Sequence, residues 1–136
     1  MPSSTQQPYT PPSPPASLPL RGAVRSAILA GMDASVTGLV AGLEAEGVHT
    51  WSDATSEEVV RMAEEMDPEL VLLGAELKLD LRAVLEEIRA AAPRARAFFL
   101  LAEPSPNAAL DLVRAGVDDV LIPPFTAAGV LMRVHV

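Results

Sequence analysis

The segment PELVLLG, residues 68–74, constrains the fold more than any other part of the sequence. Its apolar run is too short for an independent helix, and a proline and a glycine bound it. Such a run is typical of a strand that is buried on both faces of a parallel sheet. Gly74 follows this strand at its carboxyl end, where open α/β sheets normally keep their functional groups, and it offers no side chain there.

Five expected strands alternate with five expected helices around this run. Thr55 and Glu58 form a capping box at the start of one helix. Ser105 and Pro106 give another helix a cap and a proline at its first position. Alternation with short connections indicates right-handed crossovers and a parallel sheet covered on both faces, so we expect a three-layer α/β domain.

The expected elements follow from apolar spacing and from turn residues. In the helix that Gly116 closes, Leu110 and Val113 are expected to face inward. The expected strands are 26–30, 48–51, 68–73, 97–101 and 120–122, and the expected helices are 35–46, 56–67, 80–92, 106–115 and 127–136.

The first 22 residues differ in composition from the rest of the chain. Residues 1–20 hold seven of the thirteen prolines, which favour extended polyproline II and oppose a packed element. We expect 1–22 to be a disordered leader or linker, or alternatively a docking peptide for a proline-binding partner. Residues 23–136 form the expected domain, whose last helix would be cut short at Val136 if the chain is a piece of a longer protein.

Composition excludes several classes of function. The net charge of −8 opposes binding to a phosphate backbone, so no nucleic-acid partner is expected. No apolar run is long enough to cross a membrane, and no secretory signal is present. The absence of cysteine excludes disulfides and fits a cytoplasmic protein. His49 and His135 have no partners at the spacing of a metal site or a catalytic triad.

Three stretches resemble the receiver domain of two-component response regulators. Residues 68–73 are similar to the family's PDLVLLD strand, 114–121 to its raGAdDYL segment, and 123–125 to its KPF segment. The resemblance spans about residues 25–136. It implies a flavodoxin-like, doubly wound parallel sheet in the order 2-1-3-4-5, a role in bacterial signalling, and a cis peptide bond before Pro124.

Receivers accept a phosphoryl group on an aspartate beside a magnesium ion that acidic side chains hold. The position of that aspartate is Gly74 in this sequence, and the two metal-binding acids fall on Gly31 and Met32. Only Asp33, one place further on, is acidic. The resemblance therefore implies that the nucleophile and the metal site are both missing.

Receivers also use a hydroxyl and a lysine to meet the phosphoryl oxygens. These two positions are Ala102 and Pro123, and the aromatic switch position in the last strand is Val120. We therefore interpret the chain as a pseudo-receiver, which keeps the fold without the phosphorylation chemistry. It is expected to be no enzyme and to use no metal or cofactor.

The resemblance also points to an interaction face. In many receivers the fourth helix, fifth strand and fifth helix bind partners or form homodimers, with acids of the strand meeting a basic residue of the last helix. Plain surface solvation is the alternative explanation for these charges. The candidate residues for a protein partner, a fused output domain or a homodimer are Asp111, Arg114, Asp118, Asp119 and Arg133.

Two alternatives belong to other classes of function. In the first alternative, the chain is an atypical regulator that is phosphorylated at a displaced acid, Asp33 or Asp80. In the second, the chain binds a small ligand in the emptied pocket, since Gly74 and Ala102 leave room where receivers have charged groups.

Overall fold

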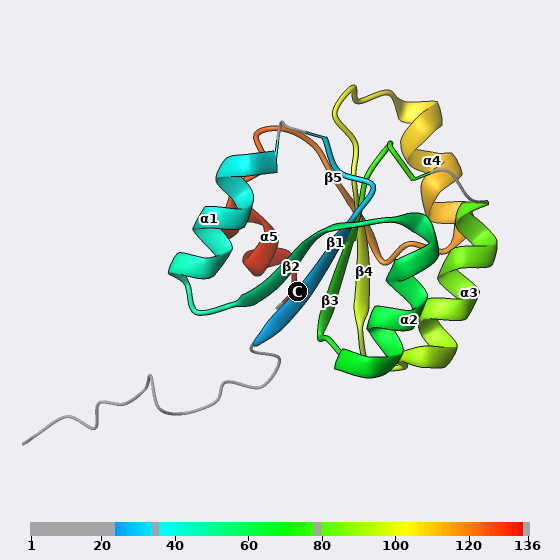
Figure 1. The fold of residues 1–136 in the computed structure, drawn as a ribbon. Coiled ribbons are helices and arrows are strands. Elements are labelled where there is room, and N and C mark those ends of the chain that lie inside the picture. The colour runs from blue at the N-terminus through cyan, green and yellow to red at the C-terminus, as the bar shows by residue number, and fades with distance from the viewer. Residues whose placement is uncertain (1–23, 34–35, 78–79, 135–136) are drawn as a thin grey trace, which may run out of the picture.

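The computed structural model describes residues 24–33, 36–77 and 80–134 as a parallel sheet between two layers of helices (Figure 1). The strands lie in the order β2-β1-β3-β4-β5 and all pair in parallel, which confirms the predicted doubly wound, flavodoxin-like fold. None of the described helices is long and apolar enough to cross a membrane. The elements are β1 (Ser26–Ala30), α1 (Thr37–Ala45), β2 (His49–Ala54), α2 (Ser56–Met66), β3 (Leu70–Leu73), α3 (Leu81–Ala91), β4 (Arg96–Leu100), α4 (Pro106–Ala115), β5 (Asp119–Leu121) and α5 (Ala127–Val134).

Strand β3 is the centre of the sheet. All four of its residues are fully buried, and it pairs with β1 on one side and β4 on the other. Because side chains alternate along a strand, β3 supplies two separate cores. Val71 and Leu73 pack in the cluster beneath α2 and α3, whereas Leu70 and Leu72 pack in the cluster beneath α1 and α5. The prediction of a central strand buried on both faces is therefore confirmed.

Helix ends follow the predicted chemistry. The Thr55 hydroxyl accepts a hydrogen bond from the Glu58 N–H, and the Glu58 carboxylate accepts one from the Thr55 N–H. The Ser105 hydroxyl caps α4 in the same way, with Pro106 at the first helical position. Gly116 ends α4 with a φ of +116°, in the left-handed region that favours glycine.

Several strand boundaries differ from prediction. Strand β2 continues to Ala54 instead of ending at Trp51, because its pairing with β1 resumes after an irregularity between Ile28 and Ala30. Strands β4 and β5 each begin one residue earlier than expected. Such shifts depend on cross-strand hydrogen bonds, which apolar spacing does not report. The predicted edge position of β2 is correct.

The prediction for α4 is wrong. Leu110 and Val113 were expected to face inward, but their side chains are 45% and 55% exposed, and α4 has no buried residue. The helix contacts the core through Leu112 and Ala115, which are partly buried. Apolar spacing shows that a helix has an apolar face, but it does not show how much of that face the domain covers. The expectations for residues 1–22 and for His135 lie outside the described residues.

The capping box makes the start of α2 sensitive to pH. The hydrogen bond from the Thr55 N–H lowers the pKa of the Glu58 carboxyl. A carboxyl whose pKa is lower in the folded state contributes stability above its unfolded pKa and loses it as the pH falls through the folded pKa. We predict that Glu58→Gln reduces the loss of unfolding free energy between about pH 5 and pH 3, measured by urea denaturation.

Glu57→Gln is the matched control, since it removes a charge from the same helical turn and leaves the capping box intact. Its acid dependence is expected to stay near that of the unmodified chain. Equal acid dependence of the Glu58→Gln variant and the unmodified chain would contradict this role of the capping box.

Candidate functional site

Two backbone segments meet at the carboxyl edge of the sheet, directly after β1 and β3. The Gly74 N–H donates to the Ala30 carbonyl at 3.0 Å, and the Glu76 N–H donates to the Gly31 carbonyl at 2.9 Å. The Leu77 N–H donates to the Gly74 carbonyl at 3.1 Å. The loop after β3 is thus hydrogen-bonded to the end of β1 at the place where receivers carry their chemistry.

Neither glycine at this junction has space for a side chain. A Cβ on Gly74 would lie 2.5 Å from the Gly31 carbonyl oxygen, and a Cβ on Gly31 would lie 2.6 Å from the Leu77 nitrogen. Gly31 also has a φ of +71°, which residues with a Cβ rarely adopt. The obstructing atoms belong to the backbone and are hydrogen-bonded, so they cannot move aside as the end of a flexible side chain would.

A small pocket remains beside this junction. Its volume of about 20 Å³ is the space of about one water molecule. A Cβ on Gly74 would lie 3.2 Å from the Met32 sulfur. The Met32 thioether therefore fills part of the space beside Gly74. The pocket is lined by Gly31, Met32, Asp33, Val36, Gly74, Ala75, Leu100, Ala102 and Phe125.

The structure brings together five of the six positions that the sequence assigned to a degenerate phosphorylation pocket. The sixth, Pro123, is exposed and does not line the pocket. The peptide bond between Pro123 and Pro124 is cis, which confirms that expectation. Sequence reasoning missed four lining residues, although one of them, Phe125, belongs to a segment on which the resemblance rests. They are Val36, Ala75, Leu100 and Phe125.

The acidic side chains near this edge do not form a metal centre. Among the described residues no group of three or more His, Cys, Asp or Glu side chains is arranged to hold a metal ion. Asp33 is exposed and lines the pocket. Asp80, the other displaced acid, caps α3 by accepting a hydrogen bond from the Arg82 N–H at 3.2 Å.

A second candidate site lies at the edge of the sheet that β5 forms. We call the surface of α4, β5 and α5 the α4–β5–α5 face. The four large apolar residues that are most exposed in the described chain all lie on these elements or directly after β5. They are Leu110, Val113, Ile122 and Met132.

Most predicted charges of this face already have partners within the chain. The Arg133 guanidinium contacts both carboxylate oxygens of Asp119, at 2.8 and 3.2 Å. Asp118 accepts a hydrogen bond from the Ala97 N–H at 2.7 Å and pairs with Arg89 at 3.4 Å. The remaining two predicted residues, Asp111 and Arg114, are exposed on α4.

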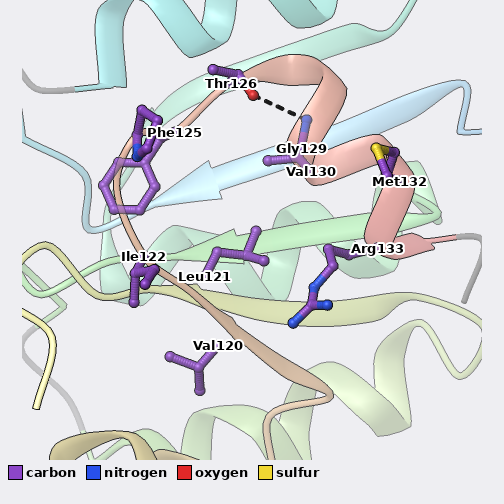
Figure 2. A pocket seen from close by; sticks show the side chains of 10 residues that line it. Val120, Leu121, Ile122, Phe125, Thr126, Gly129, Val130, Met132 and Arg133 are labelled. Atoms are coloured by element: carbon purple, nitrogen blue, oxygen red, sulfur yellow. Dashed lines mark hydrogen bonds between the residues drawn. The ribbon is translucent and has the colours of Figure 1, made fainter.

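A groove lies between β5 and α5 on the same face (Figure 2). Its volume is about 320 Å³, far larger than the pocket at the carboxyl edge. Thr126 stands at the start of α5, where its hydroxyl accepts a hydrogen bond from the Gly129 N–H at 3.0 Å. The groove is lined by Val120, Leu121, Ile122, Pro124, Phe125, Thr126, Gly129, Val130, Met132 and Arg133.

Comparison with solved structures assigns the fold. The receiver domain of NtrC4 from Aquifex aeolicus is 20% identical over 82% of this chain and 93% of its own, with a TM-score of 0.67. The same domain is known in solution as a beryllofluoride-activated dimer, which is 18% identical over 82% of this chain and 93% of its own, with a TM-score of 0.68.

The receiver domain of the sensor histidine kinase PA1611 from Pseudomonas aeruginosa, which holds a magnesium ion in its active-site cleft, is 24% identical over 83% of this chain and 96% of its own, with a TM-score of 0.68. No family model and no curated protein matches the chain. This chain has the receiver fold. At these identities the likeness concerns the fold alone.

The junction of the two glycines generates a stability prediction. We predict that Gly74→Ala lowers the unfolding free energy by about 1–3 kcal/mol, because the added methyl group overlaps the Gly31 carbonyl. Gly74→Asp, which adds the carboxylate that receivers carry at this position, is expected to cost at least as much. Urea denaturation measures both effects.

Gly38→Ala is the matched control, because a Cβ on Gly38 in α1 meets nothing within 4 Å. Its stability is expected to be unchanged or higher by up to about 1 kcal/mol, since alanine favours a helix over glycine. If Gly74→Ala were as stable as Gly38→Ala, the close approach at the carboxyl edge would not constrain the fold.

Proposed function

We propose that this chain is a signalling module with a receiver fold that binds other proteins without being phosphorylated. One observation carries the proposal. The backbone of Gly31 occupies the space that any side chain at Gly74 would need, so the carboxyl edge has no room for a phosphoacceptor. This is the place where the fold requires the nucleophile of phosphoryl transfer.

The other residues at this edge support the same conclusion. Phosphoryl transfer needs acids for magnesium and polar donors for the phosphoryl oxygens. The pocket instead presents Gly31, the thioether of Met32 and the methyl group of Ala102. Asp33 alone supplies a carboxylate to the lining, and Pro123 lies outside it. One carboxylate is too little for a magnesium ion of useful affinity.

The two alternatives have less support. Asp80 caps α3, so a phosphoryl group on it would replace a hydrogen bond that begins the helix. Asp33 lines a pocket that has space for about one water molecule, so that pocket is too small to hold a phosphoryl group and a metal ion beside it. The same volume argues against a small ligand between Gly74 and Ala102.

The α4–β5–α5 face is the proposed site of interaction, with a partner protein, a fused output domain or a second copy. Exposed apolar residues gathered on one face are typical of protein-binding surfaces. Leu110, Val113, Ile122 and Met132 form such a set. The NtrC4 receiver domain, which has the same fold, is a dimer in its beryllofluoride-activated form. Since Asp119 and Arg133 already pair within the chain, we assign the attraction chiefly to the apolar residues.

Phosphorylation is tested by incubating the chain with acetyl phosphate and magnesium and measuring its intact mass. We expect no gain of a phosphoryl group under conditions that label a receiver with its aspartate in place. A gain that disappears in Asp33→Asn or Asp80→Asn would contradict the proposal and would identify the chain as an atypical phospho-accepting regulator.

The interaction face is tested by sedimentation velocity over a range of concentrations. We expect weak self-association that Val113→Glu abolishes, because the new charge would be buried without a partner. Ala41→Glu, on the exposed surface of α1, is the matched control and should associate as the unmodified chain does. A chain that stays monomeric at every concentration, or equal association of both variants, would refute homodimerisation through this face.

A further inference from the structure

The groove between β5 and α5 is apolar and electrically neutral. Ile122 and Met132 at its border are 53% and 68% exposed. Among the described residues, the one charged residue that lines it is Arg133 (Figure 2). The Arg133 guanidinium is paired with the carboxylate of Asp119. A charged occupant would lose hydration there and gain no free partner of opposite charge. The groove therefore fits an uncharged, apolar segment.

The leader of this chain has that chemistry. Residues 1–20 contain no charged side chain, so all ten basic and all eighteen acidic residues come later in the sequence. Seven prolines restrict the backbone of this stretch, which reduces the entropy that docking costs. Proline-rich segments bind to grooves with aromatic walls, and this groove presents Phe125 beside Pro124. Leu18 and Leu20 supply larger apolar side chains at the end of the leader nearest the domain.

The chain enters the domain at the amino edge of the sheet, and one end of the groove lies at that same edge. Val24, just before β1, is partly buried and packs against the same core cluster as Leu121 and Phe125. The Val134 carbonyl at the end of α5 accepts a hydrogen bond from the Arg96 side chain, at the first residue of β4. The end of α5 that carries Met132 therefore lies at the amino edge of the sheet, where β1 begins.

The leader is long enough to reach the groove from this point. β1 and β5 are separated by three strand spacings, about 14 Å in total. At about 3.1 Å per residue in polyproline II, the four residues from Leu20 to Val24 span about 12 Å and the six from Leu18 span about 19 Å. Leu18 therefore reaches β5, and the residues before it are free to follow the groove along α5.

We propose that residues 8–18 dock in the β5–α5 groove of their own chain, with Leu18 as the anchor near Met132. The docked leader covers the α5 half of the α4–β5–α5 face, so a partner or second copy must displace it. This regulatory role rests on the proposed function of that face. The docking itself does not, because it is measured in the full chain without a partner.

The chain has no cysteine, so Ser17→Cys carries a single spin label next to the anchor. Paramagnetic broadening of amide NMR signals in the full-length labelled chain then reports which residues the leader approaches. We expect selective loss of intensity at Ile122, Gly129 and Met132. The loss should disappear in a second variant that adds Met132→Glu, where a charge enters the neutral groove.

Ala41→Glu is the matched control, because Ala41 is exposed on α1 and does not line the groove. The broadening should persist in it. Uniform broadening, or none at the groove, would overturn the proposal. A mixture of spin-labelled chain without isotope and isotope-labelled chain without a spin label separates contacts within one chain from contacts between two chains. Broadening that appears in this mixture to the same extent would assign the groove to a second copy and would also overturn docking within one chain.

Discussion

The close approach of Gly31 and Gly74 is the structural constraint on which the proposed function depends. Two backbone hydrogen bonds join the end of β1 to the loop after β3, and a Cβ at either glycine would collide with the opposing backbone. In a doubly wound sheet this edge is where strands deliver functional side chains. Here two residues without side chains close it, and the space left holds about one water molecule.

The proposed function places binding on the surface of the domain and not at its carboxyl edge. The two cores on either side of β3 take no fully buried residue from α4, which contacts one of them only through the partly buried Leu112 and Ala115. The apolar side chains of α4, β5 and α5 that remain exposed are therefore available for binding. The Arg133–Asp119 pair lies within the chain, so the groove beside it is neutral, and neutrality favours an uncharged occupant over a charged one.

The sequence was sufficient to predict the sheet, its strand order and most helix ends, because these depend on local patterns. The buried run of β3 and the reciprocal bonds of Thr55 and Glu58 are examples. It also indicated that Gly74 and Ala102 would share one pocket. It did not reveal the exposure of Leu110 and Val113, since coverage of a helix depends on its neighbours. The groove and the collision at Gly74 likewise arise from contacts between distant segments, which no local pattern encodes.

The absence of a phosphorylation switch is tested most directly by an amide-resolved NMR titration, first with magnesium and then with beryllofluoride, a mimic of the aspartyl phosphate. A closed carboxyl edge predicts no chemical-shift change at Gly31, Gly74 or Ala102 with either addition. Saturable changes at these residues would mean that the edge still binds a metal ion and a phosphoryl mimic, and the central claim would be wrong.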